Sequence, residues 1–210
     1  MKNTLLILSF LLISLVPTIA QNDAFFIMPV EDVFYISGKG TVVTGNIESG
    51  TLKIGDKVEI IGNNNQPKTA TITSIDKFRK MVDIANAGEN VGLVLKGIEK
   101  TDVSRGMVLA APEKMKAYSQ FEAEVYFLKK EEGGRTGPIT STFKPMLKIW
   151  KIDYSGEINM TESVKMILPG DNIKLIIKLT TPVALKTDLS FSIGENGKKI
   201  GSGKIIELIE

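Results

Sequence analysis

The chain has 210 residues, of which 43% are hydrophobic and 24% are charged, and its formal net charge is +2 at pH 7. This balance excludes intrinsic disorder and gives no overall attraction to nucleic acid or to an anionic membrane. The chain contains neither histidine nor cysteine, which excludes serine–histidine and cysteine–histidine nucleophilic centres, thiolate metal sites and disulfide bonds.

Residues 1–20 have the composition of a secretory signal peptide. Lys2 supplies a short positive region, residues 4–16 are almost wholly apolar, and the small residue Ala20 precedes polar residues 21–23. This order is typical of export signals, and the apolar run is shorter than the roughly 20 residues of a membrane span. We therefore expect cleavage after Ala20 and export of a mature chain without a transmembrane segment. An uncleaved anchor or a buried helix is the alternative.

The rest of the chain has the pattern of short β-strands separated by turns. Apolar residues alternate in 121–127 and again in 173–179, which predicts two half-buried strands. Glycine-rich turns recur, and many short strands with regular turns indicate barrels or sandwiches. One helical turn is expected at residues 101–105, and the segment 110–117 has so little strand pattern that it is predicted to join two domains.

Two motifs with a possible chemical role are better explained structurally. The segment 37–41, Ser-Gly-Lys-Gly-Thr, lacks the first glycine and the Mg²⁺-binding Ser or Thr of a phosphate loop, so a hairpin turn is predicted. The acidic pairs 31–32 and 131–132 are sequence neighbours, which point to opposite sides of a strand and cannot face each other across a cleft. Trp150, between two lysines, could stack on a base or a sugar, but a partly buried strand position is the preferred interpretation.

The segment 28–45, which includes Ser37-Gly38-Lys39-Gly40-Thr41, strongly resembles the second domain of elongation factor Tu. Residues 52–60, 87–92 and 105–110 continue that resemblance. Beyond the joint, several further segments are similar to the third domain of the same family, namely residues 130–135, 166–172 and 196–203. The resemblance implies an all-β chain of two consecutive small antiparallel barrels of the translation-factor type, at residues 26–110 and 118–210.

Residue by residue, the resemblance extends to the pocket in which the family holds the aminoacylated 3′ end of tRNA. The matching positions are Glu31, Asp32, Phe34, Thr44, Arg79 and Asn90. Asp76 replaces the family's glutamate, which reaches the terminal ribose, and the missing methylene shortens that reach by roughly an ångström. These matches imply either a pocket that survives in part or residues that only preserve the barrel.

In the third domain the resemblance is less complete. Arg135 matches a family residue that contacts the tRNA backbone, whereas Thr136 replaces the histidine that follows it. The segment 146–152 replaces an aromatic and arginine-bearing strand that faces the GTPase domain in the family. The change is the one expected of a chain that has lost this partner.

The family's GTPase domain would precede residue 26, where this chain has the expected signal peptide, and no phosphate loop or N-K-x-D motif occurs. We therefore expect no GTP binding, no cofactor, no metal site and no catalytic residue. The leading interpretation is an exported, non-enzymatic binding module in the bacterial periplasm, on the outer surface or secreted, whose partner is a protein or a cell-envelope component. The alternative is a translation factor that binds aminoacyl-tRNA together with a separate GTPase domain.

Overall fold

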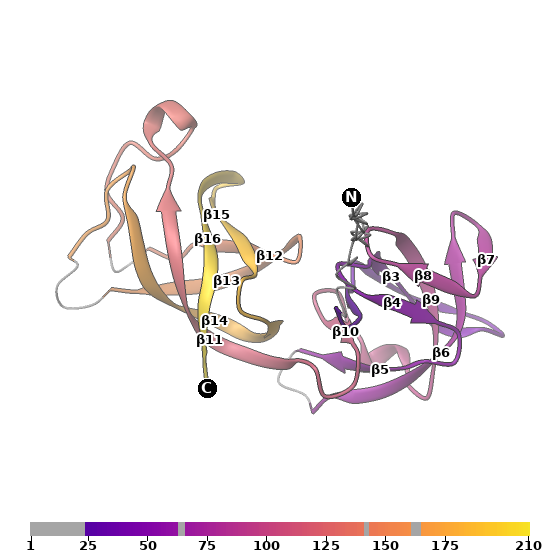
Figure 1. Ribbon diagram of the computed structural model, residues 1–210. Helices are drawn as coiled ribbons and strands as arrows, with labels where there is room; N and C mark the ends of the chain where they lie inside the picture. Colours follow the sequence, from indigo (N-terminus) through magenta and orange to yellow (C-terminus); the bar gives the residue numbers. More distant parts are fainter. Residues whose placement is uncertain (1–23, 63–65, 141–142, 161–164) are drawn as a thin grey trace, which may run out of the picture.

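The computed structural model describes residues 24–62, 66–140, 143–160 and 165–210. The expected signal peptide and its cleavage boundary lie outside these residues. Within them the regular structure is β-strand with two short 3-10 turns, arranged as two consecutive units (Figure 1). The prediction of an all-β chain is confirmed, and no described helix is long and apolar enough to cross a membrane.

The first unit is a curled antiparallel sheet with the strand order β1-β10-β5-β6-β9-β3-β2, to which β7 adds by pairing with β6. A separate two-stranded sheet, β4 with β8, completes it. Its strands are β1 (Ile27–Pro29), β2 (Asp32–Ile36), β3 (Gly40–Asn46), β4 (Thr51–Lys53), β5 (Lys57–Ile61), β6 (Lys68–Lys77), β7 (Lys80–Val82), β8 (Ile84–Asn86), β9 (Asn90–Lys96) and β10 (Val108–Ala110).

The second unit is a closed barrel with the strand order β11-β14-β13-β12-β15-β16. Closure leaves no free sheet edge in this unit, whereas the first sheet keeps β2 as a terminal strand. The barrel's strands are β11 (Lys116–Phe127), β12 (Met146–Ile149), β13 (Ile152–Asn159), β14 (Asn172–Leu185), β15 (Ser190–Glu195) and β16 (Lys198–Ile209).

Alternation of apolar and polar residues explains how the second barrel is filled. In β11 the side chains of Phe121, Ala123, Val125 and Phe127 are all buried, and Phe121 lies opposite Ile177 of β14. Successive side chains of a strand point to opposite faces, so one face of each strand enters the core. The two strands predicted from alternation, 121–127 and 173–179, are therefore confirmed as parts of β11 and β14.

The turns agree with the sequence in one place and differ in another. Segment 37–39 joins β2 to β3, with the Lys39 N–H donating to the Ile36 carbonyl at 3.0 Å, so the predicted hairpin turn is confirmed. The helical turn expected at 101–105 is instead the 3-10 turn η1 (Lys100–Asp102), and a second one, η2 (Lys130–Glu132), was not predicted. Three-residue 3-10 turns show no apolar periodicity, which is why the sequence pattern misses them.

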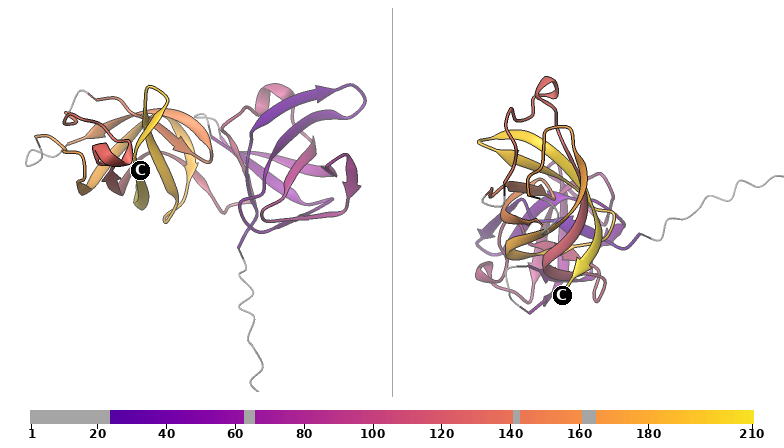
Figure 2. Two further views of the ribbon diagram at one scale, coloured as in Figure 1. Left: turned by 90° about the horizontal axis from the view of Figure 1, so that it is seen from above. Right: turned by 90° about the vertical axis from the view of Figure 1, so that its left-hand side faces the viewer.

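The two units are packed against each other on either side of the predicted joint (Figure 2). Strand β10 ends at Ala110 and β11 begins at Lys116, so the strands extend into both ends of the segment 110–117. Four buried residues of the first unit pack in the same apolar cluster as the core of the second barrel, namely Ile27, Ile61, Val108 and Ala110. The remaining core of the first unit forms its own cluster, which includes Val43, Ile75 and Leu93.

Candidate functional site

Three of the predicted site residues lie in one row across the first sheet. Asp32 pairs with Thr44, Thr44 pairs with Gly92, and Gly92 pairs with Asp76, so β2, β3, β9 and β6 each contribute one residue. The row faces away from the core, because the strand neighbours Val43 and Leu93 have no exposed surface.

Gly92 leaves an open position in the middle of this row. A β-carbon placed on Gly92 would lie 3.8 Å from Cβ of Asp76 and 3.9 Å from Cγ2 of Thr44, which is ordinary contact. With hydrogen in place of a side chain, the backbone of β9 is uncovered between the Thr44 hydroxyl and the Asp76 carboxylate. A ligand group can therefore approach the sheet here more closely than elsewhere on this face.

Phe34 and Asn90 extend the same face on either side of the row. Phe34 follows Asp32 by two positions in β2 and is 48% exposed, and Asn90 precedes Gly92 by two positions in β9. Asn90 Oδ1 accepts a hydrogen bond of 3.2 Å from Nδ2 of Asn46. We name this surface the outer face: Asp32, Phe34, Thr44, Asp76, Asn90 and Gly92.

Arg79 lies beside the outer face in the hairpin that joins β6 to β7. The hairpin turn consists of Phe78 and Arg79, both with left-handed backbone angles (φ 52° and 63°). The Arg79 backbone N–H donates a hydrogen bond of 2.9 Å to Oδ1 of Asp76. One oxygen of the Asp76 carboxylate is thus engaged in holding the turn.

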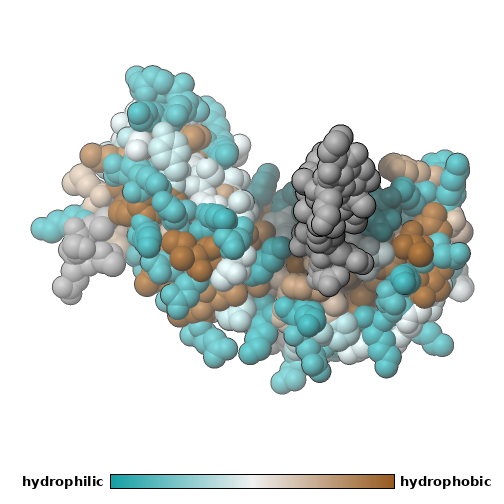
Figure 3. Space-filling view, in the orientation of Figure 1, coloured by the Kyte–Doolittle hydropathy of each residue, from teal (hydrophilic) through white to brown (hydrophobic). Residues whose placement is uncertain are grey.

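Phe78 is a functional candidate that the sequence interpretation did not include. Its side chain is 79% exposed, and Met81, three residues further on, is 60% exposed. Hydrophobic atoms reach the surface over the region of β6 and β7 (Figure 3). A pair of non-glycine residues in a left-handed hairpin turn is strained. The one sequence feature that could have drawn attention to Phe78 is the lack of Gly or Asn between two strand-forming stretches.

The two remaining predicted residues do not join the outer face. Glu31 lies just before β2, where its backbone N–H donates to the Thr44 carbonyl at 2.8 Å. Arg135 lies in the second unit, where its Nη1 is 2.6 Å from Oε1 of Glu195 and its guanidinium carbon is 4.8 Å from the ring centre of Phe143. The charge of Arg135 is therefore already paired within the barrel.

Trp150 does not occupy the partly buried strand position that the sequence favoured. It lies with Lys151 in the turn between β12 and β13, both with left-handed angles (φ 51° and 66°), and only 7% of its surface is exposed. The indole Nε1 donates a hydrogen bond of 2.7 Å to the carbonyl of Ala184. The prediction was wrong because the buried indole of Trp150 specifies this turn. The turn contains neither Gly nor Asn, the residues by which such turns are recognised in a sequence. Stacking of a base or sugar on the indole is correspondingly obstructed.

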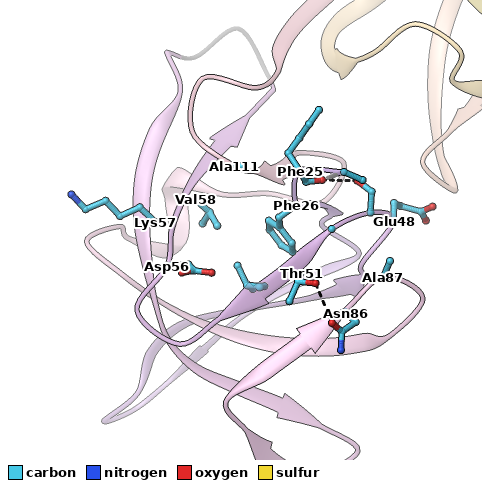
Figure 4. A pocket seen from close by; sticks show the side chains of 14 residues that line it. Phe25, Phe26, Glu48, Thr51, Asp56, Lys57, Val58, Asn86, Ala87 and Ala111 are labelled. Atoms are coloured by element: carbon cyan, nitrogen blue, oxygen red, sulfur yellow. Dashed lines mark hydrogen bonds between the residues drawn. The ribbon is translucent and has the colours of Figure 1, made fainter. Parts of the chain in front are cut away.

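A hollow of about 840 Å³ opens elsewhere on the first unit, between β4, β5 and the segment before β1 (Figure 4). Its charged residues do not converge: Lys57 and Glu48 lie at opposite sides of the view, each pointing away from the middle. Thr51 Oγ1 and Asn86 Oδ1, 3.1 Å apart, form a hydrogen bond on its wall. The hollow holds no grouping of nucleophile and base.

Several acidic side chains of the described residues accept hydrogen bonds within the chain, and Glu132 is an example. Glu132 Oε2 accepts hydrogen bonds from the Lys129 backbone N–H at 2.8 Å and from the Tyr126 hydroxyl at 2.7 Å. These bonds, the backbone one above all, hold the pKa of Glu132 below its ordinary value. Among residues 24–62, 66–140, 143–160 and 165–210, no three acidic side chains are grouped so as to hold a metal ion.

Comparison with known families agrees with the fold and with the division of the chain. The family model for elongation factor Tu domain 2 matches residues 40–110, and the model for the elongation factor Tu C-terminal domain matches residues 114–209. Neither matched domain is the family's GTPase domain. Both are β-barrel domains, and the observed units are a curled half-barrel sheet and a closed barrel. The chain therefore belongs to the elongation factor Tu family, of which it carries domain 2 and the C-terminal domain.

Proposed function

We propose that the protein is a non-catalytic binding module, derived from the barrel half of a translation factor, that acts after export in the cell envelope. The single observation that carries the binding role is the outer face, where strand register gathers Asp32, Thr44 and Asp76 around the uncovered backbone at Gly92. The expected partner is a protein or another envelope component.

The chemistry of the outer face favours a ligand with hydrogen-bond donors and an apolar group. Asp32 and the free oxygen of Asp76 are acceptors, and the Thr44 hydroxyl can accept or donate. Phe34, which is 48% exposed, supplies an apolar surface at one end. A few polar groups beside exposed aromatic surface are the usual composition of a binding site.

The test uses Gly92→Val, which places a branched side chain in the middle of the outer face. An added β-carbon meets ordinary contacts there, and valine favours strands, so the barrel is expected to fold. Envelope proteins retained on the immobilised protein are compared for wild type, Gly92→Val and the control Gly137→Val, where an added β-carbon meets no atom within 4 Å. The proposal expects a partner that is lost with Gly92→Val alone; a partner retained by all three proteins contradicts it.

The export part of the proposal has its own test. Mass mapping of the N-terminus of protein recovered from its host is expected to give a chain that begins at Gln21, after cleavage behind Ala20. A full-length product in the cytoplasm contradicts export without affecting the binding role of the outer face.

Aminoacyl-tRNA binding is the second candidate, because the outer face carries four positions that match the family's 3′-end pocket and a fifth, Asp76, where the family has glutamate. Two observations weigh against it: Arg135 is paired with Glu195, and one oxygen of Asp76 is occupied by the Arg79 N–H. We expect no preference for aminoacylated over deacylated tRNA in competition binding at physiological salt. A preference that disappears in Asn90→Ala would make this candidate the leading one.

A further inference from the structure

The terminal strand of the first sheet offers an edge for another strand. Strand β2 pairs with β3 on one side only, from Asp32 opposite Thr44 to Ile36 opposite Gly40. No described strand pairs with its other side, and the 3-10 turn η1 lies close to it. An unpaired edge presents backbone donors and acceptors that an extended peptide can use.

The side chains of β2 give the two faces of this edge different chemistry. Phe34 and Ile36 point to one face, where they are 48% and 41% exposed, and Tyr35 points to the other, where it is 65% exposed. Charged side chains such as lysine commonly protect an exposed edge strand, but β2 contains no lysine, and its one charged residue is Asp32 at its start. Its exposed side chains are those of an interaction surface.

The Tyr35 side of the edge opens on a basic hollow. The hollow has a volume of about 600 Å³ and lies between the β2–β3 hairpin and the segment 98–101. Its charged lining residues are Lys39, Lys96, Lys100 and Glu99. None of these lysines forms an ion pair with another residue in the part of the chain that the structure describes. By strand alternation Lys96 points to the same face of β9 as Gly92. Lys39 and Lys100 against one glutamate therefore supply the positive field on the Tyr35 side of the edge.

We propose that the free edge of β2 binds an extended segment of a partner protein in which acidic and apolar residues alternate. Side chains of an added strand also alternate between faces. The acidic residues then lie on the side of Tyr35, toward Lys39 and Lys100, and the apolar residues lie beside Phe34 and Ile36. This site goes beyond the proposed outer-face function, because it depends on the backbone edge of β2 and on the lysines beside Tyr35, and of its side chains only Phe34 also belongs to the outer face.

Charge distinguishes this occupant from a second copy of the same chain. Pairing of β2 with β2 would bring Lys39 and Lys100 of both copies to the same junction, and like charges at close range oppose association. In β2 the one acidic residue, Asp32, lies on the face of Phe34 and not on that of Tyr35. The Tyr35 face of β2 therefore lacks acidic side chains that would neutralise the lysines of a second copy.

The probe is a fluorescein-labelled octapeptide of alternating glutamate and valine, titrated with the purified protein by fluorescence anisotropy. Eight residues exceed the span of β2 and allow full pairing. We expect saturable binding that weakens about tenfold in Lys39→Glu/Lys100→Glu, since two attractive charge pairs become repulsive. Binding should also weaken as NaCl rises from about 50 to about 500 mM, because these pairs are exposed to solvent.

Three controls make the proposal falsifiable. Lys57→Glu, an exposed lysine of the same unit outside the hollow, and Gly92→Val on the outer face are both expected to keep the affinity within about twofold. A peptide N-methylated at alternate amides, which cannot donate to the edge, is expected not to bind. Equal binding of the N-methylated peptide or of a lysine–valine peptide overturns the proposal. Loss of binding in Gly92→Val, or dimerisation of the protein at the titration concentrations, overturns it as well.

Discussion

The hydroxyl of Tyr154 donates a hydrogen bond of 2.6 Å to the carbonyl oxygen of Gly106, so a side chain of the second barrel is held by the backbone of the first unit. Burial raises the pKa of this phenol well above its ordinary value, and the group remains a donor throughout the neutral range. Close packing surrounds the contact, because a β-carbon on Gly106 would lie 2.9 Å from the Tyr154 oxygen.

The first prediction removes this bond with Tyr154→Phe. We expect the free energy of unfolding to fall by about 1 kcal/mol, as for a typical buried hydrogen bond, measured by urea denaturation. The control is Tyr126→Phe, whose hydroxyl bonds the exposed Glu132 within one barrel and which should cost less because water can replace the partner. An equal loss in both variants would show that the contact between the units contributes nothing of its own.

The second prediction concerns Trp150, the chain's single tryptophan. Trp150→Phe removes the bond to the Ala184 carbonyl and leaves unfilled space, so we expect a loss of about 2 to 3 kcal/mol in denaturant unfolding followed by circular dichroism. Phe78→Ala is the matched control, since Phe78 occupies the equivalent turn position but is 79% exposed. It is expected to change stability by less than about 0.5 kcal/mol. The reverse order of the two effects would contradict the assignment of Trp150 as an anchor.

The third prediction is a pH dependence at Glu89. The hydrogen bond from Lys77, followed by that from the Asn86 backbone N–H, lowers the pKa of this carboxyl. A lowered pKa in the folded state gives stability that is present above the ordinary value near 4.3 and is lost as the pH falls through the folded value. Wild type should therefore exceed Glu89→Gln in stability at pH 7, and the difference should shrink steadily as the pH falls below the ordinary value of this carboxyl.

Urea denaturation at several pH values measures this difference. Glu207→Gln serves as the control, because Glu207 is exposed on β16 and forms no ion pair within the described part of the chain. A constant gap between wild type and Glu89→Gln from pH 7 to pH 3 would rule out the charge of Glu89 as its cause.

The fourth prediction is that GTP and GDP do not bind. The glycine-containing turn 37–39 connects two strands, whereas a phosphate loop must open a helix whose N-terminus receives the phosphates. Isothermal calorimetry with about 1 mM nucleotide and Mg²⁺ should give no saturable heat. At that nucleotide concentration, binding with a dissociation constant as weak as about 1 mM would be detected. Stoichiometric micromolar binding would mean that the chain contains a nucleotide site which neither its motifs nor its fold indicate.

The long strands were predictable where alternate side chains are buried, at 121–127 in β11 and 173–179 in β14. The alternation in β11 and β14 follows directly from that burial, and so does the all-β class. The hairpin turn at 37–39 was predictable for a different reason: Gly38 and Gly40 have left-handed angles (φ 81° and 94°) that glycine adopts without strain.

The turns at Phe78-Arg79 and Trp150-Lys151 were not predictable from turn chemistry. Both adopt angles that normally select Gly or Asn, and Trp150 is held there by a bond to Ala184, which is 34 residues away in sequence. The outer face was accessible only through family resemblance, since its residues come from β2, β3, β6 and β9 and only strand register brings them together. Local patterns contain no information on that register.

The pairing of β1 with β10 has a consequence for a chain that emerges amino end first. Ile27 is made early but finds its partner Ala110 only after more than eighty further residues, and both then pack against the core of the second barrel. The first sheet thus cannot be completed until residue 110 has been made, and the apolar residues that it packs against the second barrel stay uncovered until β11 and β14 have emerged. The export proposed above would have that whole interval in which to act on an unfolded chain, before a folded barrel resists transport.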